Sequence, residues 1–211
     1  EILDVKIREP IIIGGLPRSG TTHLLNLIAA DSRLRSLPYW ESLEPVPDPG
    51  EALGEAGQDP RLARCEEGYA QQLAMMPLLK NMHDMAPGHI HEEIELQGLD
   101  FSSYLLEWTA TVPRWRDYYL AQDQTPHYAY MKRVLQALQW MRGPQRWILK
   151  SPQHLEQLGP LMTTFPDAII VGTPTDPVSV IPVQGELLFA SQDWLGSPSQ
   201  ASVRLRGVVM A

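Results

Sequence analysis

The residues best suited to chemistry lie in a short loop near the start of the chain. Residues 10–31 read PIIIGGLPRSGTTHLLNLIAAD, in which an apolar run, a glycine-bearing turn and a leucine-rich amphipathic stretch follow one another. The guanidinium of Arg18 can bind a phosphate or sulfate through two hydrogen bonds, while nearby hydroxyls and backbone N–H groups add further donors. The loop therefore predicts a site for an anionic, nucleotide-like ligand, and its candidate binding residues are Arg18, Ser19, Gly20, Thr21 and Thr22.

The segments around this loop predict an α/β fold. Residues 10–15, 146–151 and 168–173 are short, apolar and rich in β-branched or aromatic residues, as buried parallel strands are, and residues 34–37 form a weaker fourth. A helix that begins just after the loop offers unpaired N–H groups and a positive dipole end to an anion. We expect a three-layer parallel sheet flanked by helices. Between the last two strands there is room for one crossover helix, although Gly159 and Pro160 should weaken or kink it.

The middle of the chain predicts a helical insertion, at about residues 58–142, after a loop rich in proline, glycine and acid. Helices are expected near residues 59–76, 100–111 and 126–141, and one face of the last is lined by Tyr130, Val134, Leu138 and Met141. The aromatic residues of this region are expected mainly in the core, with a substrate pocket as the alternative.

Composition limits the class of protein. The chain has 211 residues, 44% of them hydrophobic, and we expect one domain spanning residues 1–211. A net charge of −8 argues against nucleic acid or another polyanion as partner. We expect a cytoplasmic protein without a membrane span, because no apolar run approaches about 18 residues and no signal peptide is recognisable. The lone Cys65 excludes an internal disulfide.

The loop differs from that of the nucleotide triphosphatases. Gly15 and Gly20 have the spacing of the G-x4-G-K-[ST] loop, but Thr21 stands where that loop has lysine. Neither strand 146–151 nor strand 168–173 ends in an acid that could help to hold magnesium. A nucleotide kinase is therefore the weakest of the functions considered.

Three ordered motifs resemble the sulfotransferase family, in particular a largely bacterial branch of it. GLPRSGTT after an apolar strand is similar to the family's 5′-phosphosulfate loop, and two further stretches agree: YWESLEP at 39–45, and WILKSPQHLEQL at 147–158 followed by FPDAIIVGTPTDPVSVIP. The resemblance covers about residues 10–185. It implies transfer of a sulfuryl group from 3′-phosphoadenosine-5′-phosphosulfate to a hydroxyl of a small or lipid-like acceptor, a reaction that needs no metal.

The resemblance also implies roles for individual residues. Sulfuryl transfer places negative charge on the leaving bridging oxygen, so cations and N–H donors should stabilise the transition state. Arg18 is one such cation, and Lys150, at the end of its strand, is by resemblance a second. Ser151 either caps the following helix or binds the nucleotide.

The base that takes the acceptor's proton has several candidates. Glu41 comes first because YWESLEP occupies the region where related enzymes that sulfate tyrosine carry a catalytic glutamate. The second group is His91, Glu92 and Glu93, and the third candidate is His154. The alternation of His89, His91 and Glu93 also permits a metal site, but no further ligand cluster supports one, and we expect none.

The chain departs from the family at the 3′-phosphate site. Thr175 stands where the family has arginine, and Val183 stands where it has serine eight residues later. Each change removes a hydrogen bond to a dianionic phosphate, worth about 1.5 to 3 kcal/mol. The alternative function is therefore a catalytically impaired, sulfotransferase-like binding or scaffold protein. The tail, at about residues 191–211, no longer resembles the family and is divergent or truncated.

Overall fold

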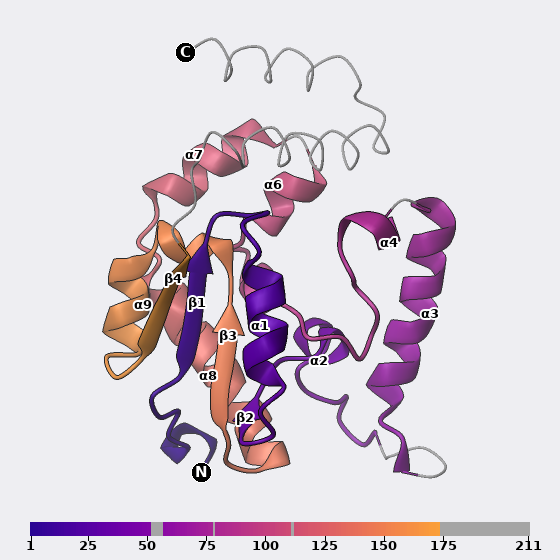
Figure 1. Cartoon of the computed structure of the whole chain (residues 1–211), viewed down its shortest axis with the longest axis horizontal. Helices are drawn as coiled ribbons and strands as arrows, with labels where there is room; N and C mark the ends of the chain where they lie inside the picture. The colour runs from indigo at the N-terminus through magenta and orange to yellow at the C-terminus, as the bar shows by residue number, and fades with distance from the viewer. Residues whose placement is uncertain (52–56, 78, 111, 174–211) are drawn as a thin grey trace.

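A four-stranded parallel sheet forms the centre of the molecule, whose computed structural model describes residues 1–51, 57–77, 79–110 and 112–173. The strands follow the order β2-β3-β1-β4, and each neighbouring pair is parallel. Their bounds are β1 (Ile11–Gly15), β2 (Leu34–Arg35), β3 (Arg146–Lys150) and β4 (Ile169–Thr173). The sequence-based prediction of a parallel α/β sheet is confirmed, and the loop after β1 lies at the carboxyl edge of the sheet (Figure 1).

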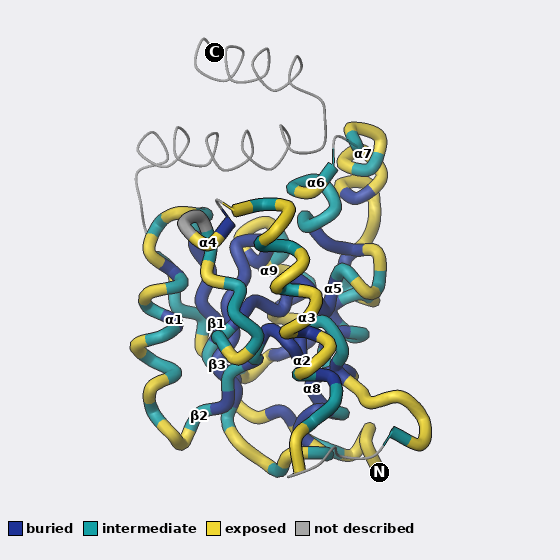
Figure 2. The backbone as a smooth tube through the Cα atoms, turned by 90° about the vertical axis from the view of Figure 1, so that its right-hand side faces the viewer, coloured by how far each residue is buried: buried dark blue, intermediate teal, exposed yellow. Residues whose placement is uncertain are grey.

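Helices cover both faces of the sheet, which gives the expected three layers. Alternate residues of a strand point to opposite faces. Ile13 of β1 and Ile148 of β3 pack with Leu25 of α1 (Thr21–Ala29), and Ile12 and Leu149 belong to a larger cluster on the other face. That cluster includes residues from α8 (Thr125–Arg142) and α9 (Leu158–Thr164), and the buried stretches of the chain lie between these layers (Figure 2).

The insertion contains two long helices, α3 and α8, and several short ones. α3 and α4 stand to one side of the sheet, whereas α6 and α7 lie beyond the carboxyl ends of its strands (Figure 1). The bounds are α2 (Tyr39–Leu43), α3 (Pro60–Met75), α4 (Leu79–Met82), α5 (Ile94–Leu99), α6 (Leu105–Thr109) and α7 (Pro113–Ala121), with a 3-10 turn, η1 (Ile2–Asp4), at the start of the chain.

The sequence predicted α3 and α8 closely and the shorter helices poorly. On α8, Val134 and Leu138 are buried, and Tyr130 and Met141 pack against the same cluster, as the helical spacing indicated. The helix expected over 100–111 is confined to α6, and the crossover is divided into η3 (Pro152–Leu155) and α9. Pro160 lies in the first turn of α9, where its missing N–H costs no hydrogen bond, so it marks a helix start and not a kink.

No helix in the described ranges combines the length and apolar composition that a membrane crossing requires.

Gly15 allows β1, the loop and β4 to approach one another closely. A Cβ atom at Gly15 would lie 1.9 Å from Thr173 Oγ1 and 2.5 Å from Thr21 Cγ2. At the preceding Gly14, a Cβ would meet only Leu155 Cδ2, at an ordinary contact distance of 3.5 Å. The close packing that ends β1 therefore depends on Gly15.

We predict that Gly15→Ala lowers the free energy of unfolding by about 2 kcal/mol, because overpacking of a close contact typically costs 1–3 kcal/mol. Gly14→Ala is the matched control and should cost less than about 1 kcal/mol. Urea unfolding followed by circular dichroism measures both, and equal losses in the two variants would contradict the steric explanation.

Candidate active site

The loop between β1 and α1 is a backbone cradle held in an unusual conformation. Arg18 has a φ of 65° and Gly20, at the N-cap of α1, a φ of 83°, so both lie in the left-handed region. Ser19 Oγ donates to the carbonyl of Leu16 at 2.6 Å and lies 3.3 Å from Thr173 Oγ1. Arg18 itself is exposed, whereas Thr21 is buried. The loop therefore presents its arginine and the start of α1 at the carboxyl edge of the sheet.

Lys150 joins the loop to the end of β3. Its side chain is buried, and its Nζ donates a hydrogen bond of 3.1 Å to Thr22 Oγ1 in the first turn of α1. The same Nζ forms an ion pair with Glu92, which precedes α5. The structure thus brings together two motifs far apart in the sequence, and adds a carboxylate from the second group of candidate bases.

The environment of Glu92 holds its carboxyl group ionised. Burial alone raises the pKa of Glu92, but the charge and hydrogen bond of Lys150, together with the nearby His83, outweigh it and lower the pKa to about 2. His83 Nε2 lies 3.7 Å from Glu92 Oε1. Glu92 Oε2 is buried and accepts no hydrogen bond from a described residue. One oxygen therefore serves Lys150 and the other is left for another donor.

Glu93 and His154 help to position the backbone of Lys150. Glu93 Oε2 accepts the backbone N–H of Lys150 at 2.9 Å, and its Oε1 accepts from His154 Nε2 at 2.5 Å. Tyr128 Oη lies 2.7 Å from His154 Nδ1, so the hydroxyl donates when Nε2 carries the ring proton. Both nitrogens of His154 are engaged in a fully buried ring, which does not favour His154 as the base. Ser151 caps η3 by accepting from Gln153 N, the first of its two expected roles.

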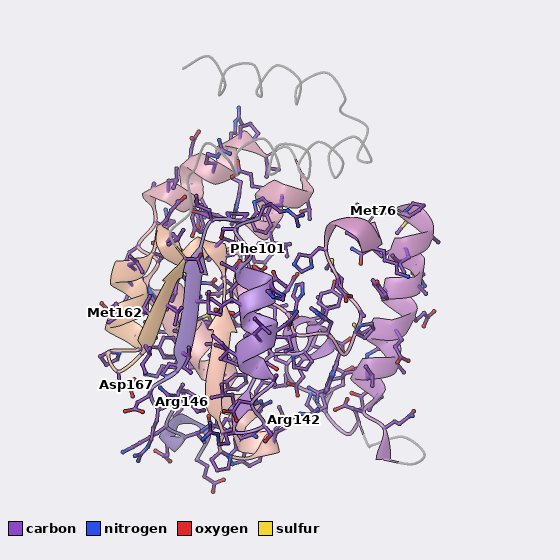
Figure 3. The ribbon with its side chains drawn as sticks, viewed as in Figure 1. Met76, Phe101, Arg142, Arg146, Met162 and Asp167 are labelled. Atoms are coloured by element: carbon purple, nitrogen blue, oxygen red, sulfur yellow. The ribbon has the colours of Figure 1, made fainter. Side chains whose placement is uncertain are left out.

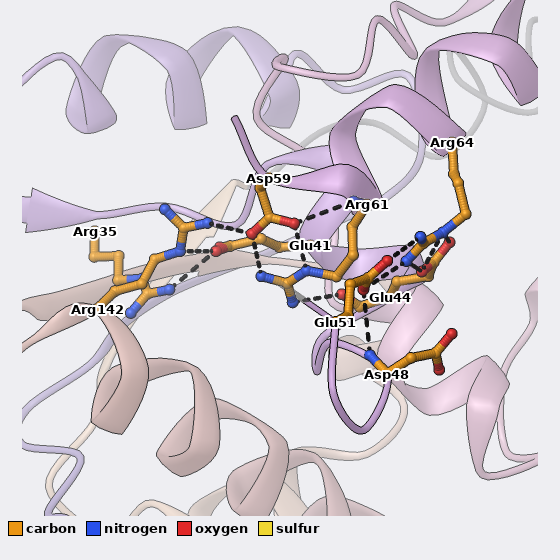
Figure 4. Close-up of polar contacts among 9 residues, drawn as sticks. All are labelled: Arg35, Glu41, Glu44, Asp48, Glu51, Asp59, Arg61, Arg64 and Arg142. Atoms are coloured by element: carbon orange, nitrogen blue, oxygen red, sulfur yellow. Dashed lines mark hydrogen bonds and ion pairs between the residues drawn. The ribbon is translucent and has the colours of Figure 1, made fainter. Parts of the chain in front are cut away.

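Glu41 lies in a different network, shown in Figure 4. Its side chain is 2% exposed, its Oε2 accepts from Arg35 Nη2 at 3.2 Å, and its Oε1 pairs with Arg142. Arg35 is level with Trp147, three residues before Lys150 on β3. Arg142 ends α8, four residues before β3 begins at Arg146, and Figure 3 labels both residues towards the amino ends of the strands. This placement does not favour Glu41 as the base, because two arginines hold its carboxylate away from the loop.

The remaining ion pairs of Figure 4 fasten the insertion to the sheet layer. Asp59 pairs with Arg61 at 2.6 Å and lies 3.6 Å from Arg142. Arg64 pairs with Glu44 at 2.6 Å and with Glu51. These contacts join α2, α3 and the end of α8, so the network is structural.

The other expected residues are either paired elsewhere or not described. His91 Nε2 lies 3.2 Å from Glu95 Oε1, and Asn26 Nδ2 lies 3.4 Å from His89 Nε2. Among the residues that the structure describes, no group of three or more His, Cys, Asp or Glu side chains is arranged to hold a metal ion. Thr175 and Val183 lie outside the described residues.

Sequence reasoning missed two features of the site. His83, which faces Glu92, lies just after α4 in an irregular segment that carries no motif. A cavity of about 380 Å³ adjoins the loop, and it is lined by Leu16 and Pro17, by residues of η3, and by aromatic side chains of α6 and α7. The only sequence signal for this cavity was the density of Trp and Tyr, which the core explains equally well.

Comparison with known proteins shows the family and agrees with the fold. The model of the family described as "Sulfotransferase family" matches residues 10–198. The fold is similar to the crystal structure of sulfotransferase STF1 from Mycobacterium tuberculosis H37Rv, with 34% identity and a TM-score of 0.74 over 89% of this chain and 51% of that one. It is also similar to sulfotransferase STF9 from Mycobacterium avium, with 28% identity and a TM-score of 0.76 over 92% of this chain and 49% of that one. The chain thus spans about half the length of these solved chains. No curated protein matches it.

We predict that Lys150→Met reverses the contribution of Glu92 to the pH dependence of stability. In the native protein the pKa of Glu92 is about 2, below its usual value of 4.5. Its carboxylate therefore contributes stability above pH 4.5 that is lost as the pH falls from 4.5 towards 2. Without Lys150 the burial of Glu92 raises its pKa, so protonation stabilises the variant. The stability gap between native protein and variant should narrow between pH 7 and pH 4.

The measurement is urea unfolding at several pH values in that range. Lys132→Met is the control, because Lys132 Nζ donates to the carbonyl of Thr164 and not to a carboxylate. The difference in free energy of unfolding between the native protein and Lys132→Met should not change with pH. If the difference for Lys150→Met is equally constant, Lys150 does not hold Glu92 ionised.

Proposed function

Because the chain belongs to the sulfotransferase family, we propose that it transfers a sulfuryl group from 3′-phosphoadenosine-5′-phosphosulfate to the hydroxyl of a small acceptor. The observation that supports this most strongly is the contact of Lys150 Nζ with Thr22 Oγ1, since it places a buried cation against the anion-binding loop. The loop lacks the lysine of the G-x4-G-K-[ST] motif, and Lys150 supplies a cation from the neighbouring strand instead.

In the proposed reaction, the loop and the two cations stabilise the leaving group. The acceptor oxygen attacks sulfur, the bond between sulfur and the bridging oxygen breaks, and adenosine 3′,5′-bisphosphate leaves with the bonding electron pair. Negative charge grows on the bridging oxygen. Arg18 and Lys150, with the N–H groups at the start of α1, provide donors and positive charge for it.

Glu92 is the base in this proposal. Its carboxylate is ionised, buried and in contact with Lys150. When a sulfuryl oxygen binds to Lys150, the ammonium group interacts less strongly with Glu92. The attraction that lowers the pKa of Glu92 is then weaker, whereas its burial is unchanged, so the pKa of Glu92 rises and its carboxylate becomes more basic. The acceptor's proton then passes to Glu92. This ties the activation of the base to the presence of the donor.

The sequence supports a second function, a binding or scaffold protein without sulfuryl transfer. Thr175 and Val183 replace the arginine and serine that hold the 3′-phosphate in the family. Loss of two hydrogen bonds of about 1.5–3 kcal/mol each would weaken nucleotide binding by a factor of 100 or more. Binding of the nucleotide separates the two functions.

We predict that adenosine 3′,5′-bisphosphate binds and that Arg18→Ala weakens its affinity at least tenfold, because the phosphate loses a charge-assisted hydrogen bond of about 1.5–3 kcal/mol. Isothermal titration calorimetry measures the affinity. Arg33→Ala is the charge-matched control: Arg33 is exposed, pairs with Asp31 after α1, and should leave the affinity unchanged within twofold.

Absence of binding by the native chain at millimolar nucleotide would overturn the enzymatic proposal. Thr175→Arg combined with Val183→Ser should then create binding if the chain is a scaffold that has lost its 3′-phosphate site.

We also predict that Glu92→Gln lowers kcat by about 10²–10⁴, the usual contribution of a general base, while the affinity for adenosine 3′,5′-bisphosphate stays within threefold. Release of the bisphosphate from the phosphosulfate donor, with a mixture of aliphatic and phenolic alcohols as acceptors, measures kcat. Glu41→Gln tests the first sequence-based candidate. It should leave kcat of the folded protein within threefold but cost about 3 kcal/mol of stability, because Arg35 loses its buried partner. A large loss of kcat in Glu41→Gln and none in Glu92→Gln would reverse the assignment.

A further inference from the structure

The cavity beside the loop has an unusually aromatic wall. Its volume is about 380 Å³, and it is lined by Tyr104 at the N-cap of α6, Trp108 of α6, and Trp115 and Tyr119 of α7. The rings of Tyr104 and Tyr119 stand edge to face, with centroids 5.0 Å apart. These four aromatic residues are thus separate from Tyr128 which, with Trp147 of β3, belongs to the core.

The cavity is attached to the reaction site at two points. Pro17, which precedes Arg18 in the loop, forms one wall, and Pro152, two residues after Lys150, forms another. Gln153 fixes the second wall to the aromatic one, because its Oε1 accepts the N–H of Tyr104 at 3.0 Å and its Nε2 donates to the carbonyl of Ser102 at 3.1 Å. In Figure 1, α6 and α7 lie beyond the end of the sheet that carries the loop. A molecule in this cavity therefore lies against the loop that carries Arg18 and against the segment that follows Lys150.

The charged groups of the cavity already have partners. Glu107 forms an ion pair with Arg116, and the hydroxyl of Tyr104 donates to Glu156. The cavity has two carboxylates and one guanidinium, and this excess of negative charge disfavours an anionic molecule. Each carboxylate already has a partner, so a cationic molecule is not favoured either. The cavity suits an uncharged molecule that can donate or accept a few hydrogen bonds at its rim.

Volume and lining narrow the class further. A cavity of about 380 Å³ is near the lower end of small-molecule sites, which span roughly 300–1,000 Å³. It fits a compact ring system and excludes a polysaccharide chain. Aromatic side chains gain most from stacked or edge-to-face contacts with another ring, whereas a flexible alkyl chain loses conformational freedom on binding.

We propose that this cavity binds the sulfuryl acceptor, and that the acceptor is a compact, uncharged aromatic alcohol. The assignment rests on the sulfotransferase function proposed above and adds the class of substrate to it. Trp115 and Trp108 act as specificity-determining residues, since they hold the ring while its hydroxyl faces the loop.

The test uses 2-naphthol as the aromatic probe, with 1-octanol and glucose as competing classes of alcohol. For the native chain we expect kcat/KM for 2-naphthol to exceed that for either other alcohol at least tenfold. Trp115→Ala should raise KM for 2-naphthol at least tenfold and leave KM for the phosphosulfate donor unchanged. Trp115→Phe keeps a ring and should restore most of the affinity.

Trp140→Ala is the matched control, because Trp140 is 55% exposed on α8 and does not line the cavity. It should leave both KM values within twofold, and thermal melting confirms that each variant is folded. Equal or better use of 1-octanol or glucose, or an unchanged KM for 2-naphthol in Trp115→Ala, would overturn the acceptor assignment and leave the sulfotransferase proposal standing. Failure of the proposal itself has a different signature, since the native chain would then not bind adenosine 3′,5′-bisphosphate.

Discussion

A buried ammonium group at the carboxyl end of β3 is the constraint on which the site depends. An ion removed from water costs several kcal/mol unless partners replace its hydration. Lys150 meets this requirement with the carboxylate of Glu92 and the hydroxyl of Thr22. Glu92 lies in the segment before α5 and Thr22 lies in α1, so their contacts with Lys150 also fix the position of the insertion relative to the loop. Glu93, the next residue, accepts the backbone N–H of Lys150, so two consecutive acids position one lysine, the first at its side chain and the second at its backbone.

The sheet supplies the rigid frame that this arrangement needs. β1 lies between β3 and β4, and Gly15 allows its end to pack against Thr173 and Thr21 without a side chain between them. The loop that follows has two left-handed residues, one of them not glycine, which are held in place because both ends of the loop belong to ordered elements. The position of Arg18 at the carboxyl edge is thus a consequence of strand order and of close packing.

The sequence predicted what short-range patterns determine. β1 and β3 are largely apolar runs whose residues are buried on both faces, and the loop motif follows β1 directly, so fold class, loop and Lys150 could be recognised. The sequence could not show which of the glutamates is best placed to act as the base. Glu41 and Glu92 are both glutamates in plausible motifs, and only the arginines at positions 35 and 142, one of them far along the chain, separate them. The cavity could not be predicted either. Trp115 and Tyr128 both contribute to the aromatic content of the insertion, and only the tertiary packing determines that the first lines the cavity and the second lies in the core.

The two buried glutamates show how one chemical group can serve structure or reaction. Glu41 has an arginine at each of its oxygens, and a guanidinium is always charged and forms several hydrogen bonds at once, so this carboxylate has no reason to change partners. Glu92 instead faces a lysine, a point charge that an incoming anion can share, and its Oε2 accepts no hydrogen bond from the described residues. A sulfuryl oxygen drawn to Lys150 would weaken the pair without breaking the fold, because Glu93, itself paired with His154, holds the lysine's backbone independently. The pair at the loop is thus able to exchange partners, and the pair at the other end of the sheet is not.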